Sequence, residues 1–149
     1  MVSKKVKILY LISLSIFLTY LLLLFYHYSD IPQTVASHVD ITGKVDGYSN
    51  KNSLLISSGV NVLILVFIGF LIKNPKSANY PVEITDENRE SAYKKMQLFL
   101  CITAIITTSV FSYMAFKAIG LERNFIYLII YLIATPLITI FYFGRNKKS

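Results

Sequence analysis

The chain has 149 residues, of which 54% are hydrophobic, and its mean hydropathy is +0.56. These values are too apolar for a soluble globular domain of this size and predict a single membrane domain instead. The formal net charge of +7 does not indicate a nucleic-acid partner, because the basic residues cluster at the ends of apolar segments.

Four segments of the sequence contain no charged residue, and each is about 20 residues long, the length of helix that crosses a hydrocarbon core of roughly 30 Å. We therefore predict four transmembrane helices embedded in a lipid bilayer. The first apolar stretch is longer than that of a secretory signal and is followed by no small-x-small cleavage site, so we expect it to remain in the protein. The expected spans are residues 7–27, 53–72, 97–117 and 124–144.

The order of these spans predicts an all-α, four-helix bundle built from two antiparallel hairpins within one domain, residues 1–149. Loop 28–52 joins the first two helices, and segment 73–96 joins the second and third. A tight turn joins the third and fourth. Pro136, near the centre of the fourth span, predicts a kink in that helix.

Basic residues are distributed unevenly between the two ends of this bundle. Eleven of the 15 lysines and arginines lie before the first span, in segment 73–96 or after the fourth span, whereas four lie at the opposite end. The positive-inside rule then places both termini and segment 73–96 in the cytoplasm and loop 28–52 outside. The expected location is the plasma membrane, with anionic lipid head groups near the basic end.

Two uncharged residues inside the spans, Asn61 and Cys101, have side chains that could take part in a site. Asn61 either forms a hydrogen bond to another helix near a site or satisfies its amide locally near the outer leaflet, and the second arrangement is the one we expect. Cys101 is the only cysteine, so no intramolecular disulfide can form. We interpret it as structural, because a thiolate is disfavoured in apolar surroundings.

Segment 73–96 begins with proline-containing turns and ends in a predicted helix. Thr85 is typical of a helix N-cap, and acidic residues follow it in the first turn, so we expect a helix to begin there and continue into the third span. Glu90 and Lys94 have the spacing of a favourable ion pair on that helix. We interpret the segment as a solvated helical extension, with a docking surface for a cytoplasmic partner as the alternative.

The loop between the first two spans is a polar segment that gathers several groups capable of chemistry. His38 can bind a metal or exchange a proton near neutral pH, and Asp40 shares its face if the chain is extended. With Asp46 they are weak candidates for a divalent-cation site, although their spacing matches no defined metal motif, and no other cofactor is expected. Catalysis would need a paired nucleophile or a second base, and neither is visible. The alternative is a structural lid in which Gly43 and Gly47 make turns.

This loop resembles that of a bacterial membrane domain of unknown function. After its first span, the family has a pattern close to Pro-x-x-(Ile/Val)-Pro-x-His-aromatic-(Asn/Asp)-x-x-Gly-x-x-Asp-Gly-aromatic-x-(Ser/Asn)-Lys. Ala36 replaces the second proline of the pattern and Val39 replaces its first aromatic residue, so we expect a less rigid loop than in other members. The chain matches the pattern at Pro32, His38, Asp40, Gly43, Asp46, Gly47, Tyr48, Asn50 and Lys51.

The family domain that this loop resembles also forms the first part of proteins that give bacilli immunity to the sporulation-delay toxin. In those proteins further spans follow the domain. The resemblance implies an external loop that meets a toxin, a peptide or an envelope component. Our main hypothesis is a non-enzymatic, multi-pass protein of the bacterial plasma membrane with an immunity, sensing or accessory role. The alternatives are a metal-dependent membrane enzyme that uses the His/Asp loop and a small transporter or channel component. The sequence leaves the oligomeric state open, a homo-oligomer included.

Overall fold

Three long helices make up most of the computed structural model, which describes residues 2–40, 44–119, 133–134 and 137. They are α1 (Lys4–His27), α2 (Asn52–Lys73) and α3 (Arg89–Ala118), and each is long and apolar enough to cross a membrane. The structure thus supports the first three predicted spans and indicates a membrane protein. The fourth predicted span and the kink expected at Pro136 lie almost entirely outside the described residues.

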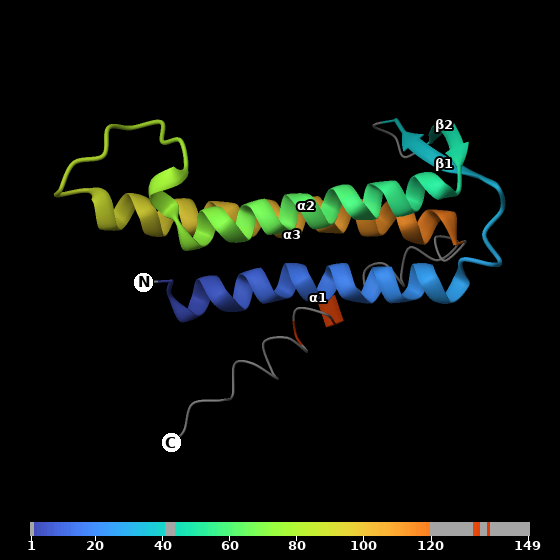
Figure 1. Ribbon diagram of the computed structural model, residues 1–149, viewed down its shortest axis with the longest axis horizontal. Helices are drawn as coiled ribbons and strands as arrows, with labels where there is room; N and C mark the ends of the chain where they lie inside the picture. Colours follow the sequence, from blue (N-terminus) through green and yellow to red (C-terminus); the bar gives the residue numbers. More distant parts are fainter. Residues whose placement is uncertain (1, 41–43, 120–132, 135–136, 138–149) are drawn as a thin grey trace, which may run out of the picture.

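The three helices pack side by side, with α2 antiparallel to α1 and to α3 (Figure 1). α1 and α2 are consecutive and antiparallel, as predicted, but α1 contacts α3 far more than it contacts α2. A side chain bridges α1 and α2: the hydroxyl of Tyr10 donates a hydrogen bond of 2.7 Å to the carbonyl oxygen of Leu65. The first two spans therefore run antiparallel, as the predicted hairpin requires, while α3 provides most of the packing for each.

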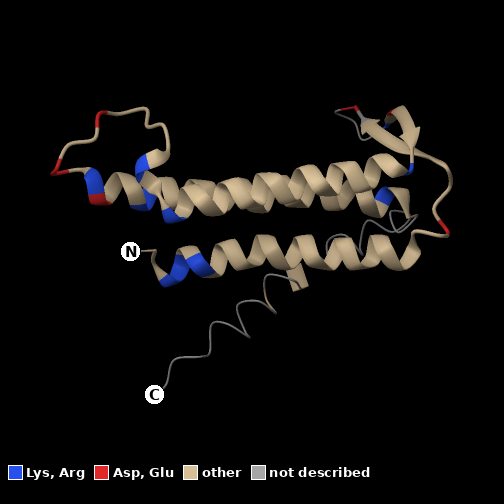
Figure 2. Cartoon of the chain, viewed as in Figure 1, with Lys and Arg blue, Asp and Glu red and all other residues tan. Residues whose placement is uncertain are grey.

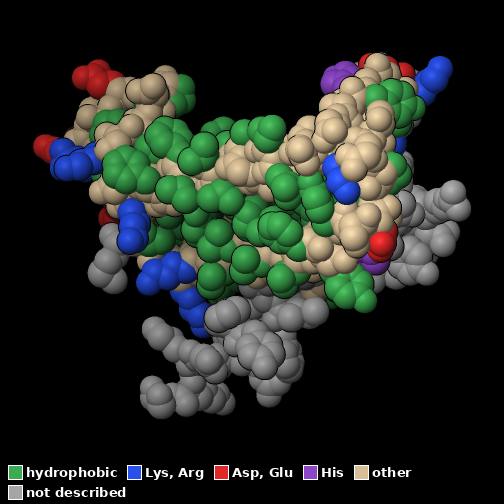
Figure 3. All heavy atoms as spheres, turned by 45° about the vertical axis from the view of Figure 1, so that its right-hand side comes forward, with side chains coloured by type: hydrophobic (Ala, Val, Ile, Leu, Met, Phe, Trp, Pro, Cys, Tyr) green, Lys and Arg blue, Asp and Glu red, His purple; other side chains and the backbone are tan. Residues whose placement is uncertain are grey.

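Apolar side chains cover the outside of the helices as well as their core. Large hydrophobic residues such as Leu22, Ile56 and Leu63 are about 70% exposed. Figure 3 shows hydrophobic side chains across the middle of the visible face, with charged side chains toward its two ends. An apolar surface of this extent suits acyl chains better than water, which agrees with the length and composition of the helices.

A polar cluster joins the three helices inside this apolar bundle. Asn61 of α2 is fully buried, and its Nδ2 atom donates to the hydroxyl of Tyr20 on α1 at 3.1 Å. The hydroxyl of Thr108 on α3 donates to the Oδ1 atom of Asn61 at 3.3 Å. The expectation that Asn61 pairs locally is therefore wrong, because the turn of α2 that carries it faces both neighbouring helices. Cys101 is also buried, as expected of a structural cysteine.

The connection between α2 and α3 folds back at the basic end of the bundle. A short helix, η1 (Pro75–Ser77), follows α2 directly. The predicted N-cap at Thr85 is three residues too early, since α3 begins at Arg89 and its N-cap is Asn88. Thr85 instead caps a turn: its hydroxyl accepts from the backbone of Asn88, and the Asn88 side chain accepts from the backbone of Thr85. The predicted ion pair between Glu90 and Lys94 is present at 2.6 Å.

A small antiparallel sheet forms in the loop between α1 and α2. Its strands are β1 (Thr34–Val39) and β2 (Val45–Asn50). The chain is therefore mostly helical and not all-α. The sheet sits at the end of the bundle opposite the N-terminus and opposite the α2–α3 connection (Figure 1).

Candidate functional site

The β1–β2 hairpin is anchored to the bundle by an apolar cluster. Leu24 of α1, Ile31 and Val35 of the loop and Leu54 of α2 are each at most 5% exposed and pack together. β1 also contacts α3. Because an isolated two-stranded hairpin is only marginally stable in water, we infer that this cluster holds the sheet in place.

Lys51 ties the two ends of the loop together. Its backbone N–H donates to the carbonyl of Gln33 at 2.9 Å, and its Nζ atom donates to the carbonyls of Tyr28 at 3.3 Å and Ile31 at 3.5 Å. The ammonium group also lies 4.8 Å from the centre of the Tyr28 ring, within the range of a cation–π contact. Lys51 is thus placed for a structural role at the base of the hairpin.

The start of α2 is fixed by amide side chains. Asn50, the last residue of β2, accepts a hydrogen bond of 2.9 Å on its Oδ1 atom from the backbone of Asn52. The Oδ1 atom of Asn52 in turn accepts from the hydroxyl of Tyr28 at 2.7 Å. These contacts connect the end of the sheet, the first turn of α2 and the end of α1.

Gly47 allows His38 to approach the opposite strand. The register shifts at a β-bulge, so that His38 lies opposite Gly47. A Cβ atom on Gly47 would lie 3.0 Å from the Cβ of His38, which is closer than side chains normally pack. Gly47 therefore lies within β2 and does not make the turn that the sequence suggested. In this arrangement the Nδ1 atom of His38 contacts the Oδ1 atom of Asp46.

Asp40 closes the hairpin near its tip. Its Oδ1 atom accepts from the backbone N–H of Lys44 at 3.0 Å, and its own N–H donates to the carbonyl of Lys44 at 2.9 Å. Gly43 lies outside the described residues. Within the described part of the chain, no three His, Cys, Asp or Glu side chains are grouped so as to hold a metal ion. The divalent-cation hypothesis stays a prediction, and it requires a ligand in addition to His38 and Asp46.

The outer face of the hairpin is polar with one large aromatic ring. Side chains on β2 alternate between partly buried and exposed, which leaves Asp46, Tyr48 and Asn50 on the exposed side. Tyr48 is 69% exposed, so its ring is available to a partner. Pro32 is exposed just before β1 and lines a small pocket of about 190 Å³ with residues that include Ile119 of the α3 end.

Two contributors to this site were not among the candidate site residues. Val35 anchors β1 and Tyr28 supports Lys51, yet the resemblance emphasised polar residues and glycines. The signal that could have identified Val35 is the (Ile/Val) position of the loop pattern, which it occupies. No spacing rule would have paired Tyr28 with Lys51, because the contact depends on how the loop folds back.

Comparison with known proteins gives one result at this site. Residues 15–62 match a family described as "Domain of unknown function (DUF1648)". The matched segment runs from the middle of α1 through the hairpin into α2, so it contains every candidate loop residue. No curated protein and no solved structure matches the chain. The match agrees with the expected resemblance to an uncharacterised domain and leaves the relation to immunity proteins a prediction.

Proposed function

We propose that this chain is a multi-pass protein of the bacterial plasma membrane that acts by recognition and not by catalysis. Its hairpin faces the outside of the cell and binds a toxin, a peptide or an envelope component, in an immunity, sensing or accessory role. The observation that carries the proposal is an anchored hairpin whose outer face presents Tyr48 next to the His38–Asp46 pair.

The composition of the exposed face supports recognition. Tyrosine contributes a large, rigid contact surface at low entropic cost and is enriched among the residues that dominate binding energies. The His38–Asp46 pair adds polar groups next to that ring, and both of its side chains are partly exposed. The anchoring cluster around Val35 supports a face that is formed before a partner arrives, which lowers the cost of binding.

The distribution of charge supports the orientation. Figure 2 shows that most lysine and arginine residues of the described chain lie at the end of the bundle with the N-terminus and the α2–α3 connection. Lys44, Lys51 and Lys117 are the basic residues of the described chain at the hairpin end. By the positive-inside rule this asymmetry favours a cytoplasmic basic end and an external hairpin.

Survival under toxin challenge tests this proposal. A strain that lacks the protein should be more sensitive than its parent to at least one antimicrobial peptide or envelope-active toxin in a candidate panel. Expression of the wild-type chain should restore survival. A Tyr48→Ala chain should protect at least about tenfold less at the same dose, as expected for an exposed aromatic that dominates an interface.

The matched control is Ser77→Ala, which alters an exposed residue at the opposite end of the bundle and should protect like the wild type. Expression levels of both variants are compared on membranes. If the deletion strain is no more sensitive than its parent to any member of the panel, the recognition proposal fails.

A further inference from the structure

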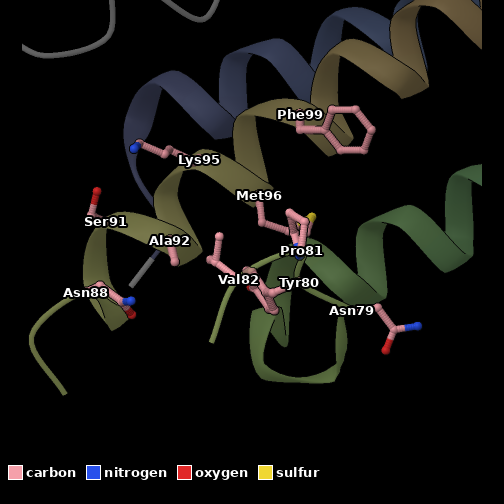
Figure 4. A pocket seen from close by; sticks show the side chains of 10 residues that line it. All are labelled: Asn79, Tyr80, Pro81, Val82, Asn88, Ser91, Ala92, Lys95, Met96 and Phe99. Atoms are coloured by element: carbon pink, nitrogen blue, oxygen red, sulfur yellow. The ribbon is translucent and has the colours of Figure 1, made fainter. Parts of the chain in front are cut away.

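A second surface feature lies at the other end of the molecule. Between the α2–α3 connection and the beginning of α3 is an open pocket of about 630 Å³. Figure 4 shows Tyr80, Pro81 and Val82 of the connection facing Ala92 and Met96 of α3 across it. None of the residues in this pocket belongs to the hairpin or to the family match.

The wall that the connection contributes is held in place. The hydroxyl of Tyr80 donates a hydrogen bond of 2.7 Å to the carbonyl of Pro75, and its ring lies 5.7 Å from that of Tyr93. Burial, with a smaller contribution from Tyr93, raises the pKa of the Tyr80 hydroxyl and so favours its protonated, donating form. The pocket is therefore formed by the fold itself and does not depend on a ligand.

The positive charge of Lys95 at the pocket has no carboxylate partner among the described residues, although acidic residues lie nearby. Arg89 is paired with Asp86, and Lys94 is paired with Glu90. Lys95 also lines the pocket, and the described residues supply no carboxylate partner for it. The charge of its exposed ammonium group is thus available to an anionic ligand.

The pocket continues into an apolar stripe along α3. Lys95 is followed at helical spacing by Phe99, Ile102, Ile106 and Val110, and these four side chains are between 52% and 62% exposed. The distance along the helix from Phe99 to Val110 is about 16 Å, close to half of the roughly 30 Å hydrocarbon core. A cation at the polar end of a stripe one leaflet deep matches the shape and charge of a phospholipid.

We propose that this pocket binds an anionic phospholipid. Lys95 contacts the phosphate, the hydroxyl of Ser91 lies one turn away on the same side of the helix (Figure 4), and one acyl chain follows the stripe that begins at Phe99. A water-soluble anion would gain nothing from the apolar stripe. A zwitterionic lipid such as phosphatidylcholine carries its own cation beside the phosphate, so it would leave the net charge of Lys95 uncompensated.

Lipid competition on the full-length protein tests the proposal. The wild-type chain, purified in a mild detergent, is titrated with phosphatidylglycerol or phosphatidylcholine of the same acyl length, and retained lipid is measured by native mass spectrometry. We expect about fivefold tighter retention of phosphatidylglycerol, the effect of one well-placed cation near an anionic head group. Equal retention of the two lipids would overturn the proposal without reference to any variant.

Adjacent lysines provide a matched pair of variants. Lys95→Gln should abolish the preference for phosphatidylglycerol, whereas Lys94→Gln removes the same formal charge from a residue already paired with Glu90 and should retain it. Lys95→Arg should retain the preference for phosphatidylglycerol, since it keeps the positive charge. Equal losses in Lys94→Gln and Lys95→Gln would show general charge attraction and contradict a site at the pocket.

Discussion

Asn61 illustrates what a single polar side chain contributes inside an apolar bundle. It contacts Tyr20 on one neighbouring helix and Thr108 on the other, so it links all three helices by hydrogen bonds. In a bilayer there is little hydrophobic force between helices, and packing and hydrogen bonds determine their relative positions. The rotation of α2 about its own axis is therefore fixed in part by this amide.

Replacing Asn61 with leucine should destabilise the bundle by about 1 kcal/mol, because two interhelical hydrogen bonds of modest strength are lost. The measurement is equilibrium unfolding in mixed micelles followed by circular dichroism. Ser57→Ala is the control, since the Ser57 hydroxyl bonds only to Leu54 in its own helix and its loss should change little. Indistinguishable stabilities for the two variants would contradict a linking role for Asn61.

Two glycines of α2 should respond in opposite directions to alanine. A Cβ on Gly69 would lie 2.6 Å from the hydroxyl oxygen of Tyr10, which is held by its bond to Leu65, whereas a Cβ on Gly59 meets no atom within 4 Å. Gly59→Ala should stabilise the helix by about 0.5 kcal/mol, the usual advantage of alanine over glycine.

Gly69→Ala should cost about 1 kcal/mol, because the Tyr10 side chain must move and give up its hydrogen bond. The same unfolding experiment measures both variants. In a Tyr10→Phe background the cost of Gly69→Ala should fall, since that hydrogen bond is already absent. A Gly69→Ala protein more stable than the wild type would contradict the packing described for α1 and α2.

At the level of elements, the hairpin depends on the bundle beneath it. Val35→Ala removes two methyl groups from the anchoring cluster and should destabilise the hairpin by about 1.5 kcal/mol. Hydrogen exchange of backbone amides in β1 and β2 should accelerate about tenfold, while the amides of α3 remain as slow as in the wild type. Tyr48→Ala, an exposed change on β2, should leave exchange nearly unaltered. Equal acceleration by both variants would mean that the anchor does not hold the sheet.

The helices were predictable from the sequence because a bilayer imposes a simple requirement on length and charge. The hairpin was not. Its strands include Asp46, Gly47 and two serines, which have little preference for strands, so their pairing depends on the Val35 anchor and on the neighbouring helix ends. The start of α3 was misplaced for a related reason, because Thr85 caps a turn as effectively as it would cap a helix.

The site was predictable as a set of residues but not as a geometry. The loop pattern singled out His38, Asp40 and Asp46, and the structure pairs the first with the third while Asp40 bonds to the hairpin tip. That outcome follows from a bulge, whose position the order of residues does not reveal, and from the missing side chain at Gly47, which the sequence suggested for a turn. Asn61 was misjudged because its partners depend on helix rotation.

At the scale of the whole molecule, the two proposed binding surfaces lie at opposite ends of an apolar bundle. The hairpin with its exposed Tyr48 lies at one end. Most lysines and arginines of the described chain lie at the other end, where the pocket at Lys95 is also found (Figure 2). The recognition proposal depends on which end faces the cytoplasm. The orientation is therefore the central claim, and it can be measured without knowledge of any ligand.

Labelling of one introduced cysteine at a time, in intact cells, measures this orientation. Tyr48→Cys and Ser77→Cys place an exposed thiol at opposite ends, and native Cys101 is fully buried and gives little background. With a membrane-impermeant maleimide, we predict that Tyr48→Cys reacts in intact cells and that Ser77→Cys reacts only after the membrane is opened. Labelling of Ser77→Cys in intact cells, with Tyr48→Cys protected until lysis, would contradict the account.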